Sequence, residues 1–320
     1  MVVLIRYGEI GLKGRNRPQF ERQLLRRIRF GLGSLPARLR REHGRLFVES
    51  EASWPEIAER LRRVFGIVAF SPVRVVPLKL ADIEQAALAE LHAVVQERGT
   101  DPGQGRPLTF KVEARRANKR FPLTSLELNQ VLGRALLEAP PPGIELRVDV
   151  HAPEIVVHVE IRDEAAYVYA RSERGLGGLP VGSSGRALAL LSGGIDSPVA
   201  VWLTLKRGVT VDCVHFHSYP FTSDRSKEKV IELARILARY GGPLRLFVVH
   251  FTDIQTAIHQ NCPPGLGVTI MRRMMFRVAE RLAEQTGALA LVTGENIGQV
   301  ASQTLESMLT IAAVAQRPVL

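Results

Sequence analysis

The sequence predicts an α/β protein of three successive domains, which we place at residues 1–75, 76–172 and 173–320. Along the 320 residues, short apolar runs of strand length alternate with segments whose apolar residues recur at helical spacing. A stretch rich in Gly and Ser, residues 172–186, follows neither pattern and is typical of a linker. Beyond it, apolar strands and helices alternate, and this pattern predicts a doubly wound parallel sheet with helices on both faces.

Residues 1–75 predict a strand, a helix, two strands, a helix and a strand, in this order. VVLIRY is the first strand, and Pro18 suits the first turn of a helix in RPQFERQLLRRIRFG. PARLRRE and RLFVES predict two strands around a turn at His43 and Gly44, WPEIAERLRRVFG predicts a helix, and IVAFSPVRVV predicts a strand. This order is that of the ferredoxin-like α+β fold.

Residues 76–172 predict a second α/β unit. LADIEQAALAELHAVVQERG is helical, PLTFKVEA is a strand, and TSLELNQVLGRALLEA is a helix with Thr124 or Ser125 as its N-cap. IELRVDV, EIVVHVEI and AAYVYAR predict three further strands. Between the first strand and the second helix, the stretch RRANKRFP places four cations around one phenylalanine.

Charge and composition limit the function classes. The formal net charge is +11, and residues 1–75 carry sixteen Lys and Arg against seven Asp and Glu. A basic segment of this kind favours a polyanionic partner, although a generally arginine-rich composition would also explain it. The two cysteines, Cys213 and Cys262, exclude a four-cysteine metal site. No apolar run is long enough to span a bilayer and the start is not a signal peptide, so we expect a cytoplasmic protein.

The most informative stretch is LALLSGGIDSPVAVW, where a buried strand gives way to a helix. Gly193 and Gly194 allow unusual backbone dihedrals and a close approach of N–H groups to an anion, and the helix N-terminus adds free donors. Ser192 and Ser197 can donate hydrogen bonds to phosphate oxygens. Asp196 suits a phosphate site only if a cation such as Mg²⁺ lies between them. A plain glycine-rich turn, with Asp196 capping the helix, is the alternative.

Several motifs resemble one family. SGGIDS after LALL resembles the pyrophosphate loop (PP-loop) of the ATP pyrophosphatases, whose domain is adenine nucleotide α-hydrolase-like. HFHSYPFTS, TIMRRMMFRVAERLAE and TGENIGQVASQT are similar to segments of tRNA 4-thiouridine synthetase, a family that also serves thiamine biosynthesis as a sulfurtransferase. RYGEIGLKGRNRPQFE and FKVEARRANKRFPLTS resemble its ferredoxin-like and THUMP domains. The resemblance covers almost the whole chain in the family's order.

The resemblance implies a site for ATP and Mg²⁺ at the carboxyl ends of the strands. Ser192, Asp196 and Ser197 would serve catalysis, with Asp196 as the ligand of Mg²⁺. The implied ATP-binding residues are Leu190, Leu191, Gly193, Gly194, His215, Phe216, Arg272, Gly294 and Gln303. His215 and Gly294 each follow an apolar strand, which agrees with the rule that open α/β sheets bind ligands at these strand ends.

The resemblance to a THUMP domain implies that the basic stretch binds RNA. The implied residues are Arg115, Arg116, Lys119, Arg120 and Phe121. The cations would neutralise phosphates, and Phe121 would stack on a base. A solvated hairpin with Phe121 tucked into the core is the alternative.

The activity that the resemblance implies is that of an ATP-dependent tRNA sulfurtransferase. The O4 atom of the uridine at position 8 would attack the α-phosphorus of ATP, and a persulfide would then replace the resulting AMP at C4. The implied partners are tRNA, a cysteine desulfurase as persulfide donor and a thiamine sulfur-carrier protein; a homodimer is left open. Another PP-loop adenylating enzyme, or an RNA-binding module with a vestigial ATP site, is the alternative.

The resemblance also carries an expectation about the end of the chain. Members of the family continue past the position of Leu320, and their sulfur-handling cysteine lies in that continuation. We therefore expect a nucleotide domain that is truncated at its C-terminus and a chain that does not complete sulfur transfer. Cys262 is the one credible substitute for the missing thiol.

Overall fold

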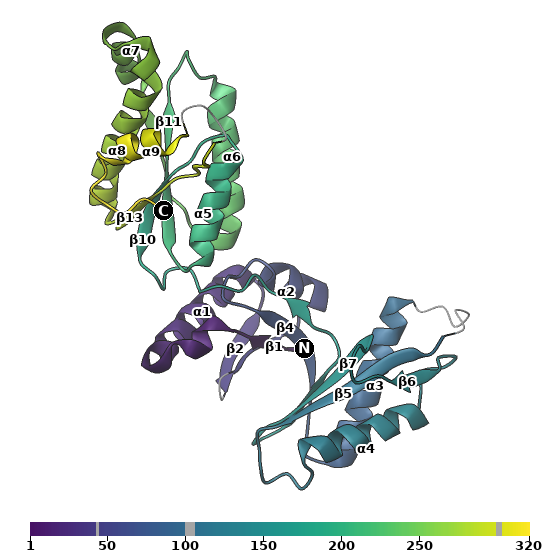
Figure 1. The fold of residues 1–320 in the computed structure, drawn as a ribbon. Coiled ribbons are helices and arrows are strands. Elements are labelled where there is room, and N and C mark those ends of the chain that lie inside the picture. Colours follow the sequence, from purple (N-terminus) through teal and green to yellow (C-terminus); the bar gives the residue numbers. More distant parts are fainter. Residues whose placement is uncertain (43–44, 100–105, 299–302) are drawn as a thin grey trace. The chain divides into compact units, whose positions relative to one another are not determined.

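The computed structural model describes residues 1–42, 45–99, 106–298 and 303–320. They form two compact units (Figure 1). The first unit comprises Met1–Arg6, Leu35–Ala58 and Ala69–Arg174, and the second comprises Tyr7–Ser34, Glu59–Val68 and Gly175–Leu320. Residues 1–75 thus contribute to both units, and the domain boundaries at residues 75 and 172 stay predictions. No helix in the described part of the chain combines the length and the apolar character needed to cross a membrane.

The first unit is built on one mixed sheet with the strand order β2-β3-β1-β4-β8-β7-β5-β6, in which β9 also pairs with β4. The strands are β1 (Val2–Arg6), β2 (Ala37–Glu42), β3 (Arg45–Ser50), β4 (Ala69–Val76), β5 (Leu108–Arg116), β6 (Leu146–Val148), β7 (Ile155–Ile161), β8 (Ala166–Tyr169) and β9 (Glu173–Arg174). The sequence predicts two separate α/β blocks, but the antiparallel pairing of β4 with β8 joins their strands into a single sheet.

The element order of the N-terminal part confirms the ferredoxin-like prediction. The chain runs β1, α1 (Arg17–Leu32), β2, β3, α2 (Trp54–Leu61), β4. Pro18 lies in the first turn of α1, as predicted. The strands β2 and β3 pair antiparallel, and the turn predicted at His43 and Gly44 lies outside the described residues.

The middle part of the chain has the predicted THUMP order. Its helices are α3 (Leu80–Arg98) and α4 (Ser125–Glu138). Thr124 caps α4 with its side chain, and Glu127 returns a bond to the backbone of Thr124, which makes a complete capping box. Buried residues of both helices pack with β5 and β7 in one hydrophobic core.

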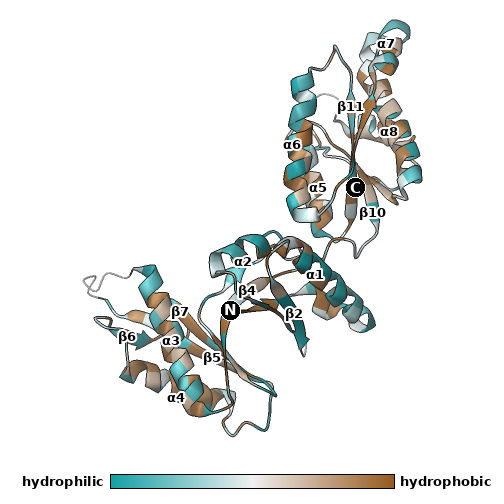
Figure 2. Ribbon diagram, turned by 180° about the vertical axis from the view of Figure 1, so that it is seen from behind, coloured by the Kyte–Doolittle hydropathy of each residue, from teal (hydrophilic) through white to brown (hydrophobic). Residues whose placement is uncertain are grey.

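The second unit contains a parallel sheet of the order β12-β11-β10-β13. The strands are β10 (Arg186–Leu190), β11 (Thr210–His217), β12 (Leu246–His250) and β13 (Ala290–Val292). The helices are α5 (Asp196–Lys206), α6 (Asp224–Gly241), α7 (Thr252–Asn261), α8 (Gly267–Thr286) and α9 (Leu305–Ala312). One core lies between the sheet and α5 with α6, and another between the sheet and α8 with α9 (Figures 1 and 2). The predicted doubly wound domain is therefore confirmed.

The glycine-rich stretch at residues 172–186, predicted to be a linker, contains the boundary between the two units at residues 174 and 175, and its following part is packed rather than free. Leu179 and Val181 are 4% and 1% exposed. The N–H group of Leu179 donates to the carbonyl of Lys206 at 2.9 Å, and Gln23 and Arg27 of α1 donate to the carbonyl of Val181 at 2.6 and 2.8 Å. The glycines are required here because the backbone approaches other backbone closely.

Gly178 and Gly177 test this explanation as a matched pair. Both have a positive φ, 74° and 66°, so alanine at either position is strained by about 1–3 kcal/mol. A Cβ at Gly178 would also lie 2.2 Å from the carbonyl oxygen of Lys206, whereas a Cβ at Gly177 would meet nothing within 4 Å. We predict that Gly178→Ala lowers the thermal unfolding midpoint of the chain clearly more than Gly177→Ala, as followed by circular dichroism. Equal losses in the two variants would contradict the packed arrangement.

Candidate nucleotide site and nucleic-acid interface

The loop that joins β10 to α5, residues 191–195, occupies the position where a doubly wound sheet binds ligands. In the sheet, β10 lies between β11 and β13. The connection through α5 leads to β11 on one side, and β13 pairs on the other side. The strand order thus reverses next to β10, and open α/β sheets bind ligands at the carboxyl ends of the strands at such a point.

The hydroxyl groups of Ser192 and Ser197 make hydrogen bonds within this loop. Ser197 is 6% exposed, and its Oγ accepts a hydrogen bond of 2.9 Å from the N–H group of Ser192. The two hydroxyls lie 3.0 Å apart, and the N–H group of Gly194 donates to the hydroxyl of Ser192 at 3.3 Å. The structure thus gives Ser197 a role in shaping the loop; its contact with phosphate stays a prediction.

The two glycines of the loop do not have the unusual dihedrals that we expected. Neither Gly193 nor Gly194 has a positive φ. A Cβ at Gly193 would make its nearest contact at 3.6 Å, and a Cβ at Gly194 would lie 3.5 Å from the hydroxyl of Ser192, both ordinary distances. The protein's own packing would therefore accept a side chain at either position. What glycine provides here is an uncovered backbone, which a ligand can approach closely.

Asp196 is the first residue of α5, and its carboxylate is free. The N-cap position belongs to Ile195, which makes no side-chain capping bond. Within the described residues, the Asp196 side chain makes no hydrogen bond and no ion pair. The alternative in which Asp196 only caps the helix is therefore wrong, and the carboxylate is available to a cation or ligand.

Beside the loop lies a cavity of about 320 Å³. Its lining residues are Leu190, Ser192, Ser197, Arg272, Met275, Phe276, Thr293, Gly294, Glu295 and Gln303. The structure thus brings six of the predicted site residues together: Leu190, Ser192, Ser197, Arg272, Gly294 and Gln303. Leu191, Gly193, Gly194, Asp196, His215 and Phe216 are predicted site residues that do not line this cavity.

His215 and Phe216 differ in whether their side chains are available to bind a ligand. His215, near the end of β11, is 7% exposed, and its Nδ1 lies 3.0 Å from the carbonyl oxygen of Leu191. Its Nε2 is buried and has no hydrogen-bond partner in the part of the chain that the structure describes. Burial lowers the pKa of His215, so the ring is neutral near pH 7. Phe216 packs edge-on against Phe251, with ring centroids 5.2 Å apart. His215 therefore has an unused polar atom, whereas Phe216 serves core packing on the α8 side.

Two polar groups inside the cavity have unusual surroundings. Arg272 of α8 forms an ion pair with Glu295, and the two side chains are 19% and 12% exposed. The Oε1 atom of Gln303 is buried and has no hydrogen-bond partner among the described residues. Buried acceptors are rarely left unpaired, so this oxygen is available to a donor on a ligand. Sequence reasoning missed Glu295, although a carboxylate three residues after an apolar strand is the signal that could have found it.

Gly294 is required by packing against the loop itself. A Cβ at this position would lie 2.3 Å from the backbone nitrogen of Ser197 and 2.5 Å from the carbonyl carbon of Asp196. The backbone that follows β13 thus touches the first turn of α5. A side chain at residue 294 would push this turn, and with it the loop, out of position.

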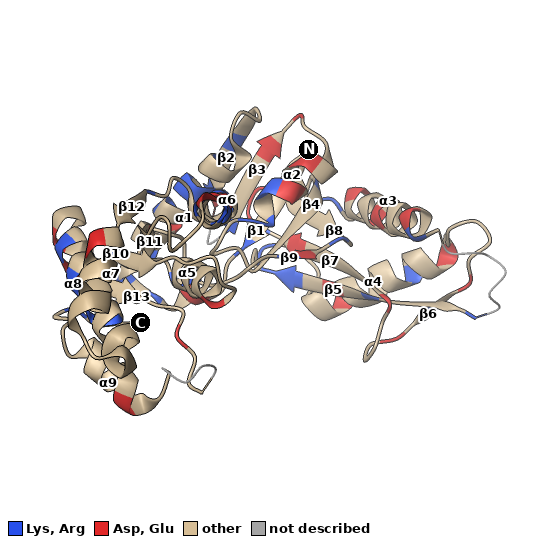
Figure 3. Ribbon diagram, turned by 90° about the horizontal axis from the view of Figure 1, so that it is seen from above, with Lys and Arg blue, Asp and Glu red and all other residues tan. Residues whose placement is uncertain are grey.

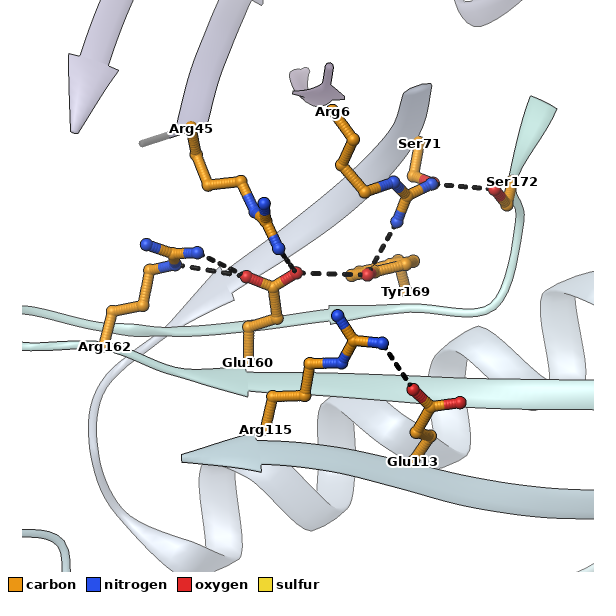
Figure 4. A network of polar contacts seen from close by, with 9 residues as sticks. All are labelled: Arg6, Arg45, Ser71, Glu113, Arg115, Glu160, Arg162, Tyr169 and Ser172. Carbon is orange, nitrogen blue, oxygen red and sulfur yellow. Dashed lines mark hydrogen bonds and ion pairs between the residues drawn. The ribbon is translucent and has the colours of Figure 1, made fainter. Parts of the chain in front are cut away.

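A second candidate site is a basic cavity of about 260 Å³ in the first unit. Its lining residues are Arg45, Arg115, Arg116, Ala117, Glu160, Ile161 and Arg162. Glu160 is 4% exposed and accepts from Arg45 at 3.3 Å, Arg162 at 2.6 Å and the hydroxyl of Tyr169 at 3.3 Å (Figure 4). Burial raises the pKa of Glu160, but these arginines outweigh it and hold the pKa below its usual value. The buried carboxylate thus fixes two arginines at the cavity.

The predicted RNA-binding residues separate into two groups. Lys119 and Arg120 are exposed, and their side chains make no hydrogen bond or ion pair with any described residue. Arg115 is largely exposed and pairs with Glu113 at 2.8 Å (Figure 4), whereas Arg116 donates to the carbonyl of Phe121 at 3.0 Å. Lys119 and Arg120 are thus the residues of this stretch that are free to contact an anion.

The prediction that Phe121 stacks on a base is wrong. Its ring is 6% exposed and belongs to the core formed by α3, α4 and the sheet. The side chain of Asn118 accepts a hydrogen bond of 2.9 Å from the N–H group of Arg120, which forms a turn before the ring. The alternative with Phe121 in the core is confirmed.

The fold and the two sites define a class of protein: a PP-loop α/β domain combined with ferredoxin-like and THUMP elements. Models of three families match the chain: thiamine biosynthesis protein (ThiI) at residues 182–320, the ThiI ferredoxin-like domain at 2–71, and the THUMP domain at 79–171.

Individual relatives agree. A probable tRNA sulfurtransferase of Moorella thermoacetica is 56% identical over 319 residues, which are 99% of this chain and 78% of the relative. A protein of the same name in Brevibacillus brevis is 51% identical over 322 residues, 100% of this chain and 77% of the relative. A crystal structure of a 4-thiouridine synthetase–RNA complex with bound ATP is similar, with 40% identity and a TM-score of 0.88, covering 100% of this chain and 80% of that one. The chain belongs to the ThiI family.

Gly294→Ala tests whether the contact between the end of β13 and α5 maintains the nucleotide loop. We predict that the variant stays folded but loses turnover of ATP by a factor on the order of 10², the effect of displacing a site by about 1 Å. Pyrophosphate release and ATP binding by titration calorimetry measure this. Gly265→Ala is the matched control, because a Cβ there would meet nothing within 4 Å. An active Gly294→Ala variant would show that the contact does not position the loop.

Proposed function

We propose that the chain is an ATP-dependent tRNA sulfurtransferase that forms 4-thiouridine and also supplies sulfur for thiamine biosynthesis. The observation that carries this proposal is the loop between β10 and α5, with its uncovered glycines and the free carboxylate of Asp196, beside a cavity lined by Arg272 and Gln303. The names of the similar proteins support the same activity.

In this proposal, ATP binds with its adenosine in the cavity and its phosphates at the loop. The unpaired Oε1 of Gln303 accepts a hydrogen bond from the amino group of adenine. Arg272, held by Glu295, faces the nucleotide from α8. The N-terminus of α5 and the N–H groups of the loop supply partial positive charge to the phosphates.

Mg²⁺ fits this site as a partner of the nucleotide rather than as a resident ion. No group of three His, Cys, Asp or Glu side chains that could hold a metal occurs in the ranges that the structure describes. Mg²⁺ in phosphate-transfer sites is held by one or two carboxylates together with substrate phosphates and water, and Asp196 is the free carboxylate at the loop. When bound there, Mg²⁺ would neutralise phosphate charge.

The reaction divides into activation and sulfur transfer. The O4 atom of uridine 8 in tRNA attacks the α-phosphorus of ATP, and pyrophosphate leaves. A persulfide, delivered by a cysteine desulfurase, then attacks C4 with its outer sulfur, and AMP leaves with the original oxygen. A second thiol attacks the inner sulfur of the resulting disulfide, which releases 4-thiouridine and leaves a disulfide between the two thiol groups. The loop and the helix terminus contribute positioning and charge stabilisation to the first step. Cys213 takes no part in the second step, because burial raises the pKa of its thiol to about 12 and shields it from partners.

The first unit binds the tRNA in this proposal. Lys119 and Arg120 provide the phosphate contacts, and Arg115 lines the basic cavity together with Arg45 and Arg162. Within this unit, α3 carries mainly acidic side chains (Figure 3). The phosphate contacts should therefore not involve α3.

Asp196→Asn tests the nucleotide chemistry and separates it from a vestigial site. We predict that pyrophosphate release in the presence of tRNA falls by roughly 10²–10³, the effect of losing one electrostatic contact in a preorganised site. Asp253→Asn, which removes an exposed carboxylate from the first turn of α7, is the control and should retain activity. Undiminished release by Asp196→Asn would refute the assigned role, and no ATP-dependent release by the wild-type chain would favour the RNA-binding alternative.

Lys119→Ala combined with Arg120→Ala tests the RNA interface. Each phosphate contact contributes about 0.7–0.9 to the slope of log K against log salt, so we predict that the double variant reduces the slope for tRNA binding by roughly 1.4–1.8. Filter binding over a range of salt concentrations measures it. Arg134→Ala combined with Arg147→Ala removes the same charge from other exposed positions and is the control. Equal changes in the two double variants would indicate a general charge effect rather than a contact.

A further inference from the structure

A lysine of α6 lies over the PP-loop. The Cδ atom of Lys229 would be 3.6 Å from a Cβ built on Gly193, and the hydroxyl of Ser226 would be 4.0 Å from the same point. The ammonium group of Lys229 lies two bonds beyond Cδ, so a change of side-chain rotamer is enough to bring it to a ligand bound at Gly193. Lys229 is exposed and is not part of any motif singled out in the sequence.

The neighbours of Lys229 leave its charge uncompensated. Lys227 pairs with Asp224 at 3.2 Å, and the same carboxylate faces His217 at 3.7 Å. Glu232, three residues further along the helix, pairs with Arg235 at 3.2 Å. Lys229 itself has no hydrogen bond or ion pair with any residue that the structure describes. Glu232, the acidic residue at helical spacing from Lys229, thus already has a cationic partner.

The loop needs a cation from elsewhere. A Walker-type loop carries its own lysine, but SGGIDS carries none, and its only charged side chain is the carboxylate of Asp196. Pyrophosphate gains negative charge as it leaves, and such charge is stabilised most by groups already in position. Lys229 is a cation placed at the loop by a different element.

The position of Lys229 relative to the sheet indicates which phosphates of ATP it contacts. Arg272 comes from α8, which covers one face, whereas Lys229 comes from α6, which covers the other with α5 (Figure 1). Arg272 lines the cavity proposed for adenosine, and Lys229 does not. We propose that Lys229 binds the β- and γ-phosphates of ATP and the pyrophosphate that leaves; this rests on the proposed function.

The test compares ligands that contain the pyrophosphate group with one that lacks it. In the full chain, we expect Lys229→Ala to weaken the binding of ATP and of inorganic pyrophosphate by roughly 10- to 100-fold, as loss of a charged hydrogen bond does. The binding of AMP should be unchanged, and Lys229→Arg should retain most of the affinity for ATP. Lys227→Ala, which removes the same charge two residues away, is the matched control and should bind ATP like the wild-type chain.

Three outcomes would overturn the proposal. If Lys229→Ala weakens AMP as much as ATP, the lysine maintains the loop and does not bind the pyrophosphate group. If Lys229→Ala and Lys227→Ala weaken ATP binding equally, the effect comes from the net positive charge of the region and not from a contact of Lys229. If the wild-type chain binds ATP and Lys229→Ala binds it equally well, this proposal fails while the proposed function stands; if the wild-type chain binds no ATP, both fail.

Discussion

The nucleotide site depends on one steric constraint, the contact between Gly294 and the first turn of α5. The strands β10 and β13 are parallel neighbours, with Ala189 opposite Val292, so the segments that follow them leave the sheet at the same edge. The backbone of Gly294 then comes so close to the N–H group of Ser197 that a Cβ would be only 2.3 Å away. This contact holds the first turn of α5 in place, and the hydroxyl of Ser197 accepts a hydrogen bond from the N–H group of Ser192 within the loop. The cavity lies between these two segments and α8, with Ser192, Gly294 and Arg272 among its lining residues.

The nucleotide site contains two kinds of charged side chain: those that form an ion pair within the protein and those that have no such partner. Arg272 is already paired with Glu295, so its guanidinium is held in place before a nucleotide arrives. Asp196 and Lys229, in contrast, have no partner among the described residues. Opposite charges that are both unpaired at one loop suit a ligand that brings anionic phosphates together with a cation. The first unit has the same two kinds of charged side chain. Buried Glu160 accepts hydrogen bonds from Arg45 and Arg162, whereas exposed Lys119 and Arg120 have no partner among the described residues.

Much of the fold followed from the sequence because its signals are local. The helical spacing in α1 and α4, the capping residues Thr124 and Glu127, and the strand-to-helix junction at Gly193 each depend on residues close together in the chain. The same locality explains the errors. A Gly- and Ser-rich composition is typical of a linker, but only the carbonyl of Lys206, distant in sequence, makes Gly178 a site of close packing.

The sequence by itself determined the order of the elements, the class of the domains and the position of the nucleotide loop, because periodicity and turn chemistry act over a few residues. Only the tertiary structure decided which way Phe121 points, since the cations around it suit an exposed and a buried ring equally. It also decided that Glu295 meets Arg272 and that Lys229 lies over Gly193. These pairs come from different elements, and the packing of helices on the two faces of the sheet brings them together. The residue pattern of a single helix or strand does not specify these contacts, because they depend on the rotation and the shift of each helix relative to the sheet.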